Sequence, residues 1–264
     1  MEELIRAWLH DHQEEVLDCL RYLVRIETQN LAPRGNEAKG QLAIAGMLRA
    51  LGCEVDVYDL QSVPGLLDHP RYWADRPAMG RPNVMALRRG TGGGCSLLFS
   101  GHVDTVPVGP DPWTHDPWGG EVADGKLWGL GAYDMKAGLA ASIMAVKALH
   151  DLNIHLRGDL MVESVVDEEF GGCNGTLAAR LKYNAHLAVV PEPTNLVVCL
   201  AHHGGLMLRV PFHGKPGWGF SLMPLRIREA GLHRTCEGRT NGICSGDAPL
   251  GHHHWPHPEV SYHA

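Results

Sequence analysis

The 264-residue chain has no uninterrupted apolar run near the roughly 18 residues that a membrane-spanning helix needs. Its N-terminus, MEELIRAWLHDHQEE, carries acids where a secretory signal carries bases, and it lacks the apolar core and small-residue cleavage site of such a signal. Basic residues are fewer than acidic ones, 23 against 30, so the formal net charge is −7. We therefore expect a cytoplasmic protein that binds neither nucleic acid nor a membrane.

Paired cysteine motifs are absent as well. The seven cysteines are odd in number, none forms a CxxC motif, and several lie in apolar contexts such as LVVCL. This usage is typical of buried free thiols in a reducing compartment. With 44% hydrophobic and 20% charged residues, the chain has the composition of a globular protein with a substantial core.

Helix-like and strand-like segments alternate along the first 200 residues. Periodicity predicts helices over 2–26, 37–51 (with Gly52 as the C-cap), 135–151 and 174–182. Apolar runs predict strands over 53–60, 83–89, 95–104, 158–169 and 185–193. The strands 83–89 and 95–104 are predicted to form a hairpin around GTGGG, and 61–82 a surface loop. The alternation favours an α/β fold with a largely buried sheet.

Acids and one histidine collect where the predicted strands or Gly turns end. They occur within SGHVDTVP (100–107), GLGAYDMKAG (129–138), SVVDEEFGG (164–172) and VVPEPTN (189–195). The candidate residues are His102, Asp104, Asp134, Glu168, Glu169 and Glu192. Charged groups at the mouths of buried strands are costly unless something pairs with them, and imidazole and carboxylate are ligands that zinc accepts. The joint pattern predicts a two-metal hydrolase site at the carboxyl edge of the sheet.

The spacing suggests separate tasks for the first three candidates. His102 and Asp104 are two residues apart on a predicted strand, so they point to the same face. One nitrogen of His102 could then bind a metal while Asp104 holds the other nitrogen. Asp134 follows the turn GLGAY at a predicted helix start, where its charge is favoured and its two oxygens could bridge two ions.

The glutamates follow two later strands. Glu168 and Glu169 are adjacent at a strand end and point in different directions, which permits one to bind a metal and the other to act as a base. Glu192 lies between two prolines, so its backbone is stiff. Taken singly, each candidate has a plainer interpretation, such as a helix cap for Asp134 or a solvated strand end for the glutamate pair. The six together in chain order favour the metal site.

These motifs resemble those of the M20 metallopeptidase family, which includes acetylornithine deacetylase, succinyl-diaminopimelate desuccinylase, aminoacylase and carboxypeptidase G. The matching text is SGHVDTVP, the run from Trp113 to Gly138 that reads W-x-x-DPW-x-G-x-x-x-DGKLWGLGAYDMKAG, SVVDEEFGGCNGT, and PEPTN. The resemblance covers about residues 1–215. One departure is Leu130, where many members have Arg.

The resemblance implies a zinc-aminopeptidase-like catalytic domain with a mostly buried mixed sheet flanked by helices. It also implies that His102 and Glu192 bind one zinc, that Asp134 bridges, and that Glu169 binds the second zinc. Glu168 would be the general base, and Asp104 would orient His102. The implied reaction is hydrolysis of an amide bond next to a free carboxylate, in an N-acyl amino acid or peptide. Two Zn²⁺ would serve an intact site, with Co²⁺ or Mn²⁺ as substitutes, and intact homologues would be homodimers through their lid.

The family pattern weakens near Lys215. Residues 217–264 contain no lysine, hold 6 of the 17 histidines, and show no helical or strand stripe. We therefore expect a catalytic domain over 1–204, the start of an incomplete lid domain over 205–216, and a disordered or out-of-frame tail over 217–264. The return segment that would supply a last histidine ligand is missing, so the chain is expected to be a low-activity fragment. The alternatives are a non-catalytic metal-binding or interaction module and a gene-prediction artefact.

Overall fold

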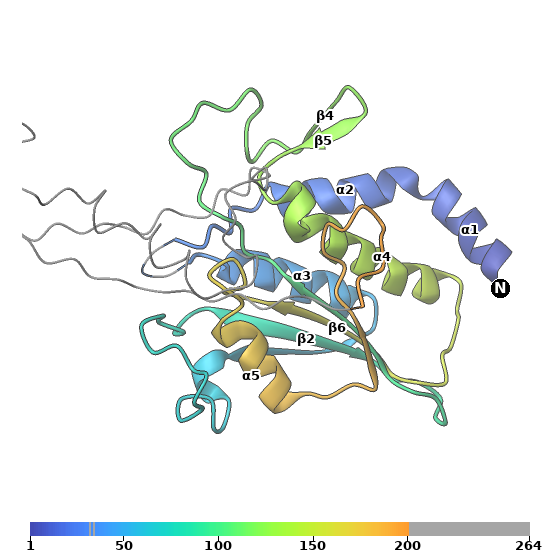
Figure 1. The fold of residues 1–264 in the computed structure, drawn as a ribbon. Helices are drawn as coiled ribbons and strands as arrows, with labels where there is room; N and C mark the ends of the chain where they lie inside the picture. Colours follow the sequence, from blue (N-terminus) through green and yellow to red (C-terminus); the bar gives the residue numbers. More distant parts are fainter. Residues whose placement is uncertain (32, 34, 201–264) are drawn as a thin grey trace, which may run out of the picture. The chain divides into compact units, whose positions relative to one another are not determined.

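The computed structural model describes residues 1–200, apart from 32 and 34. Its centre is a five-stranded sheet of order β1-β2-β6-β3-β7 (Figure 1). The strands are β1 (Glu54–Asp59), β2 (Pro82–Arg88), β3 (Leu97–His102), β6 (Leu160–Val165) and β7 (Leu187–Val189). β1, β2 and β6 are antiparallel neighbours, whereas β6, β3 and β7 are parallel. The prediction of a mixed sheet is confirmed.

The predicted hairpin of 83–89 with 95–104 is wrong. β6 lies between β2 and β3, pairing with the first antiparallel and the second parallel. The reason is visible in the glycine turn 90–94, which packs on the segment just before β6. Thr91 N and Gly92 N donate to the carbonyl oxygens of Leu156 and Arg157 at 2.9 Å each, so the turn spans the width of an intervening strand.

Helices cover both faces of the sheet (Figure 1). They are α1 (Glu2–Asp11), α2 (Gln13–Val24), α3 (Ala38–Ala50), α4 (Ala137–Asp151) and α5 (Asn174–Lys182). α2, α3 and α4 lie on one face, and α5 lies on the other. Successive residues of a strand point to opposite faces of the sheet. Val84 and Val162 pack against the face that α3 and α4 cover, whereas Met85 and Met161 pack on the face that α5 covers. This burial on both faces explains the near-continuous apolar strands.

The helix boundaries largely agree with the periodicity, with one break. The predicted helix 2–26 is two helices, because the chain leaves helical geometry at His12, where φ is −114° and ψ is 22°. His12 instead stacks on Trp8, with ring centroids 4.1 Å apart. Gly52 has φ +77° and follows α3 as expected; its N–H and that of Cys53 bond back to Arg49 and Leu48, which closes the helix.

Two connecting segments differ from expectation. The loop 61–82 was predicted to lie on the surface, but its Leu66 and Arg81 are buried. Leu66 packs in the apolar cluster on the α5 side of the sheet, and Arg81 pairs with Glu37 and Asp167. The long segment 105–131 contains an unpredicted hairpin, β4 (Glu121–Ala123) and β5 (Lys126–Trp128). Its turn residues Asp124 and Gly125 both have positive φ, 53° and 70°, which is the geometry that Asp-Gly favours.

β7 is shorter and more exposed than the buried strand predicted over 185–193. Leu187 and Val189 are 62% and 46% exposed, because β7 pairs only with β3 in the part of the chain that the structure describes. The expectations for 205–216 and 217–264 lie outside the described residues. Among the described helices, none is long and apolar enough to cross a membrane.

Candidate metal centre

The candidate residues meet where two parallel strands end. His102 is the last residue of β3 and pairs with Val165, the last residue of β6. The chain then continues from β6 into Asp167, Glu168 and Glu169. Because parallel strands end at the same edge, the two motifs are adjacent although they are more than 60 residues apart in sequence. The two motifs therefore lie together at this edge of the sheet, and the metal site there stays a prediction.

The His102 ring is buried, with 1% of its side chain exposed, and its two nitrogens face different partners. Nδ1 lies 2.9 Å from the carbonyl oxygen of Asp104 and 3.5 Å from its Oδ1. We expected the carboxylate to hold this nitrogen, but the carbonyl is the closer acceptor. Since a carbonyl oxygen can only accept, Nδ1 carries the proton. Nε2, on the other side of the ring, would be the atom able to bind a metal, which needs the neutral form of His102.

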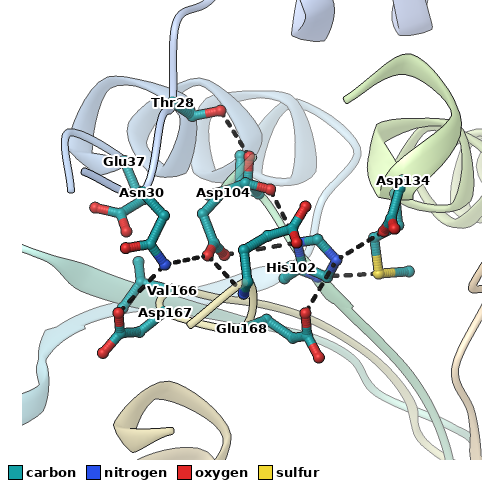
Figure 2. A network of polar contacts seen from close by, with 12 residues as sticks. Thr28, Asn30, Glu37, His102, Asp104, Asp134, Val166, Asp167 and Glu168 are labelled. Atoms are coloured by element: carbon teal, nitrogen blue, oxygen red, sulfur yellow. Dashed lines mark hydrogen bonds and ion pairs between the residues drawn. The ribbon is translucent and has the colours of Figure 1, made fainter. Parts of the chain in front are cut away.

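Three carboxylates surround the other nitrogen. Nε2 lies 3.2 Å from Asp134 Oδ1 and 3.6 Å from both Glu168 Oε2 and Glu192 Oε1. Figure 2 shows His102 between Asp104 on one side and Asp134 and Glu168 on the other. Burial alone would lower the pKa of His102, but the surrounding Asp104, Asp134 and Glu168 raise it well above its ordinary value. The carboxylates around the ring thus create a negative electrostatic potential, which favours a positive charge at this point.

Three candidate ligand atoms lie close enough together to share one metal ion. One ligand atom from each of His102, Asp134 and Glu169 lies within 4.8 Å of the other two. Burial and neighbouring carboxylates raise the pKa of Glu169 to about 8, and burial with Asp134 and Glu168 raises that of Glu192 to about 7. Acids crowded in this way are costly as anions, and a divalent ion would remove that cost. The donor set of one imidazole and several carboxylates fits zinc.

Asp134 is placed by a glycine turn and a buried lysine. Gly131 has φ +72°, and its carbonyl oxygen accepts from Lys136 N at 3.0 Å, which closes the turn that carries Asp134 into α4. Lys136 is fully buried and its Nζ donates to the carbonyl oxygens of Leu23 and Ile26 at 3.0 and 2.8 Å. Burial lowers the pKa of Lys136 to about 7. The end of α2 is thereby tied to the turn that carries a candidate ligand.

Glu192 is placed by the close approach of its segment to α4. A Cβ added to Gly138 would lie 2.1 Å from the carbonyl oxygen of Pro191. Only glycine lets the first turn of α4 and the 191–193 segment approach this closely. Asp134 precedes that turn and Glu192 follows Pro191, so the same contact brings the two acids to His102.

A buried polar network behind the site was not predicted. Asp104, fully buried, accepts through Oδ2 from Asn30 Nδ2 at 2.7 Å and from the backbone N–H of Glu169 at 3.0 Å. Asn30 contacts Asp167, which in turn pairs with Arg76 and Arg81 (Figure 2 labels Asn30, Asp104 and Asp167). Burial alone would raise the pKa of Asp104, but His102, Asn30 and the Glu169 N–H lower it. No local sequence pattern links these residues.

Residues 98–250 match the family model described as peptidase family M20/M25/M40. The chain belongs to this family. It is 33% identical over 192 residues to N-formyl-4-amino-5-aminomethyl-2-methylpyrimidine deformylase of Bacillus subtilis, covering 71% of this chain and 41% of that protein. It is 36% identical over 169 residues to succinyl-diaminopimelate desuccinylase of Methylorubrum extorquens, covering 57% and 43%.

The fold agrees with that of a solved M20-type structure. Human carnosine dipeptidase 1 superimposes with a TM-score of 0.57 at 25% identity, over 72% of this chain and 41% of that one. The predicted M20 resemblance is confirmed, and so is the catalytic-domain fold with its mixed sheet. The chain spans about two fifths of the length of the curated relatives it matches. The M20 match begins at Leu98 in β3, so it includes all six candidate residues.

Proposed function

We propose that this M20 chain forms the metal-binding part of a zinc-dependent amidohydrolase that cleaves an N-acyl amino acid or peptide next to a free carboxylate. The observation that carries the proposal is the convergence of His102, Asp134 and Glu169, whose ligand atoms lie within 4.8 Å of one another. Support comes from relatives that are named a deformylase, a desuccinylase and a dipeptidase, all of which act on small N-acyl compounds or peptides.

For the metals, we propose that His102 and Glu192 hold one ion, Glu169 holds a second, and Asp134 bridges them. Zn²⁺ is the preferred ion, with Co²⁺ or Mn²⁺ suited to the same ligands. When bound, the ions would polarise the substrate carbonyl and acidify a water molecule. The second ion would have only Asp134 and Glu169 among the described residues, and two protein ligands hold zinc weakly. We therefore expect one tight zinc in this chain.

For proton transfer, we propose Glu168. Its carboxylate lies at the open side of His102, with 40% of the side chain exposed, so water and substrate can reach it. It would take a proton from the attacking water at a carboxylate oxygen and deliver it to the leaving amine nitrogen. Asp104 would act from behind, where its carbonyl oxygen fixes the tautomer of His102.

The remaining proposals concern the whole protein. Its partner would be a small-molecule substrate, it would act in the cytoplasm, and intact relatives would associate as homodimers through the lid. We also propose the boundary at 204/205 between the catalytic domain and the start of the lid. A non-catalytic metal-binding module is the competing proposal, and what supports it is that the second ion would have only two ligands among residues 1–200. Turnover distinguishes the two.

The test uses the purified 264-residue chain and three matched substitutions, Glu168→Gln, Glu169→Gln and Glu192→Gln. Zinc affinity is measured by competition with a chromophoric chelator, and hydrolysis is followed with N-formyl, N-succinyl and dipeptide substrates. We expect Glu192→Gln to weaken the tighter zinc-binding step by about 10-fold or more and Glu169→Gln to weaken the second, weaker step. Glu168→Gln should change either step by less than about three-fold. Turnover, where present, should vanish in Glu168→Gln.

The outcomes separate the proposals. Loss of the second zinc-binding step in Glu168→Gln but not in Glu169→Gln would show that the two roles are exchanged. Two tightly held zinc ions with ordinary turnover would contradict the expectation of an incomplete second site. Tight zinc without turnover on any of the substrates would favour the non-catalytic module.

A further inference from the structure

We infer that Arg76 and Asn30 are positioning residues for the metal site, acting through Asp104 on both His102 and the loop that carries Glu168 and Glu169. The inference rests on the proposed function for its consequence, since it concerns how the candidate ligands are held. Asn30 donates to Asp104 and Asp167, and Arg76 donates to Asp167. The connection runs through the fully buried carboxylate of Asp104.

Asp104 joins two parts of the site. Its carbonyl oxygen accepts from His102 Nδ1 at 2.9 Å, and its Oδ2 accepts from the backbone N–H of Glu169 at 3.0 Å. The same Oδ2 accepts from Asn30 Nδ2 at 2.7 Å. One residue therefore holds both groups, because its carboxylate holds the Glu169 backbone and its carbonyl oxygen holds the imidazole.

Asn30 can support Asp104 only in one orientation. An amide side chain has a donating and an accepting end that differ little in shape. With the amide reversed, an oxygen would face Asp104 Oδ2 and repel it. Arg76 Nη2 donates to Asn30 Oδ1, which keeps the accepting end toward the guanidinium and the donating end toward Asp104. Arg76 thus fixes the orientation that the site needs.

Several contacts hold the planar guanidinium of Arg76 in place. Its Nε and Nη2 donate to Asp167 Oδ1 at 3.0 and 2.6 Å while Nη2 also reaches Asn30. The ring of Phe170 lies 4.0 Å from the guanidinium carbon, and the side chain of Arg76 is only 3% exposed. A lysine would keep the charge but could not supply the planar pair of donors. Arg76 therefore ties Asn30 to the start of the glutamate loop.

Arg81 is a matched neighbour with different contacts. It is equally buried and also donates to Asp167 Oδ1, at 3.0 Å. Its other bonds go to Glu37 and to the carbonyl oxygen of Pro77. No hydrogen bond from Arg81 to Asn30 occurs among the described residues. If positioning works through Asn30, then Arg76 and Arg81 should differ in effect although both pair with Asp167.

The first experiment measures amide hydrogen exchange, residue by residue, in the metal-free 264-residue chain. The variants are Arg76→Lys, Arg81→Lys and Asn30→Asp, with Val162 in β6 as the reference amide. We expect the Glu169 amide to exchange about 10-fold faster in Arg76→Lys and in Asn30→Asp, and less than about three-fold faster in Arg81→Lys. Val162 should be unchanged in all three.

Three results would overturn the inference. Equal acceleration in Arg76→Lys and Arg81→Lys would mean that the arginines act only as a structural ion pair with Asp167. An unchanged Glu169 amide in Arg76→Lys would mean that Asp104 needs no help from Asn30. If Val162 accelerates as much as Glu169 in both Arg76→Lys and Asn30→Asp, these residues hold the fold and not the site.

The second experiment titrates zinc into the same variants against a chromophoric chelator. We expect Arg76→Lys and Asn30→Asp to bind zinc about 10-fold more weakly than the unchanged chain, and Arg81→Lys to bind it nearly as well. Should the unchanged chain bind no zinc, the proposed metal function fails for this chain, whereas the exchange of Glu169 still decides the positioning role. Faster Glu169 exchange in Arg76→Lys together with unaltered zinc affinity in the same variant would overturn the link to the metal.

Discussion

The two sides of His102 are built in opposite ways. Behind the ring, Asp104 is fully buried, and the charges near it are paired with Arg76 and Arg81. In front of the ring, the side chains of Asp134, Glu168 and Glu192 are 48%, 40% and 32% exposed and gather around one nitrogen. On the buried side, arginine side chains of the protein balance the negative charge. On the open side, the acidic side chains outnumber the basic ones and are partly exposed to solvent.

The pKa shifts on the two sides differ in sign for the same chemical group. The pKa of Asp104 is lowered, because His102, Asn30 and a backbone N–H outweigh its burial. The pKa values of Glu169 and Glu192 are raised to about 8 and about 7, because burial and neighbouring acids outweigh His102. Asp104 is thus stabilised as an anion behind the ring, whereas Glu169 and Glu192 are destabilised as anions in front of it. A divalent cation would reverse the second effect.

The largest effect should come from breaking the buried side. Asp167→Asn keeps the side-chain shape and tolerates the positive φ of 69°, but it leaves two buried guanidiniums with too little negative charge. We expect the free energy of unfolding to fall by about 3–5 kcal/mol, measured by urea denaturation. Asp111→Asn, on an exposed loop, is the control and should change little. A loss below about 1 kcal/mol for Asp167→Asn would show that other groups already neutralise the arginines.

A smaller effect should come from the contact that joins the two acids of the open side. Gly138→Ala places a Cβ against the carbonyl oxygen of Pro191, so we expect a loss of about 1–3 kcal/mol. The matched control is Gly46→Ala in α3, where a Cβ would meet nothing within 4 Å. Alanine there should add about 0.4–1 kcal/mol. Both values come from thermal or urea unfolding, and a stabilising Gly138→Ala would contradict the close approach.

The smallest effect concerns pH. Because folding raises the pKa of Glu169 and Glu192 above their ordinary values of 4.5, the folded metal-free chain binds more protons than the unfolded one between pH 5 and pH 7. Stability should therefore fall as pH rises through this range. The raised pKa of His102 acts in the same direction, since its contribution is lost as pH rises through the folded value. The lowered pKa of Lys136 opposes the trend only above about pH 7.

Glu192→Gln should flatten this slope, because the amide cannot ionise. The midpoint of urea unfolding between pH 5 and pH 7 provides the measurement, with Glu54→Gln on the exposed side of β1 as a control. With zinc added, the slope should reverse, since ligand deprotonation favours metal binding at higher pH. An unaltered slope in Glu192→Gln would mean that solvent screens the carboxylates of the open side, so that folding does not raise the pKa of Glu192.

The open side and Asp104 were predictable from sequence, whereas the rest of the buried side was not. His102, Asp134, Glu169 and Glu192 each follow a strand or turn, and the carboxyl ends of parallel strands meet at one edge, so local signals suffice to bring them together. Asn30, Arg76 and Asp167 lie on segments far apart in sequence, and a buried ion network leaves no periodic signal. The positive φ of Asp167, beside the glutamate pair, is likewise invisible in the residue string.

The errors in the fold have a similar origin. The hairpin prediction assumed that strands adjacent in sequence pair with each other, and a glycine turn between them supported that assumption. Gly94 instead packs against Gly158, with a Cβ position 2.5 Å from its backbone nitrogen, which leaves room for β6. The β4–β5 hairpin had a usable signal in Asp124-Gly125, but its strands are too short to show an alternating pattern.

The placement of β6 also governs how the sheet can be assembled during synthesis. β3 pairs only with β6 and β7 among the described strands, and both follow it in the chain. At about 5–20 residues per second, the ribosome takes roughly 3–12 s to proceed from the end of β3 to the start of β6. For that time the strand that ends in His102 has been synthesised but has no strand to pair with. A nascent chain that stalls shortly before Leu160 therefore carries an unpaired apolar strand for chaperones to bind.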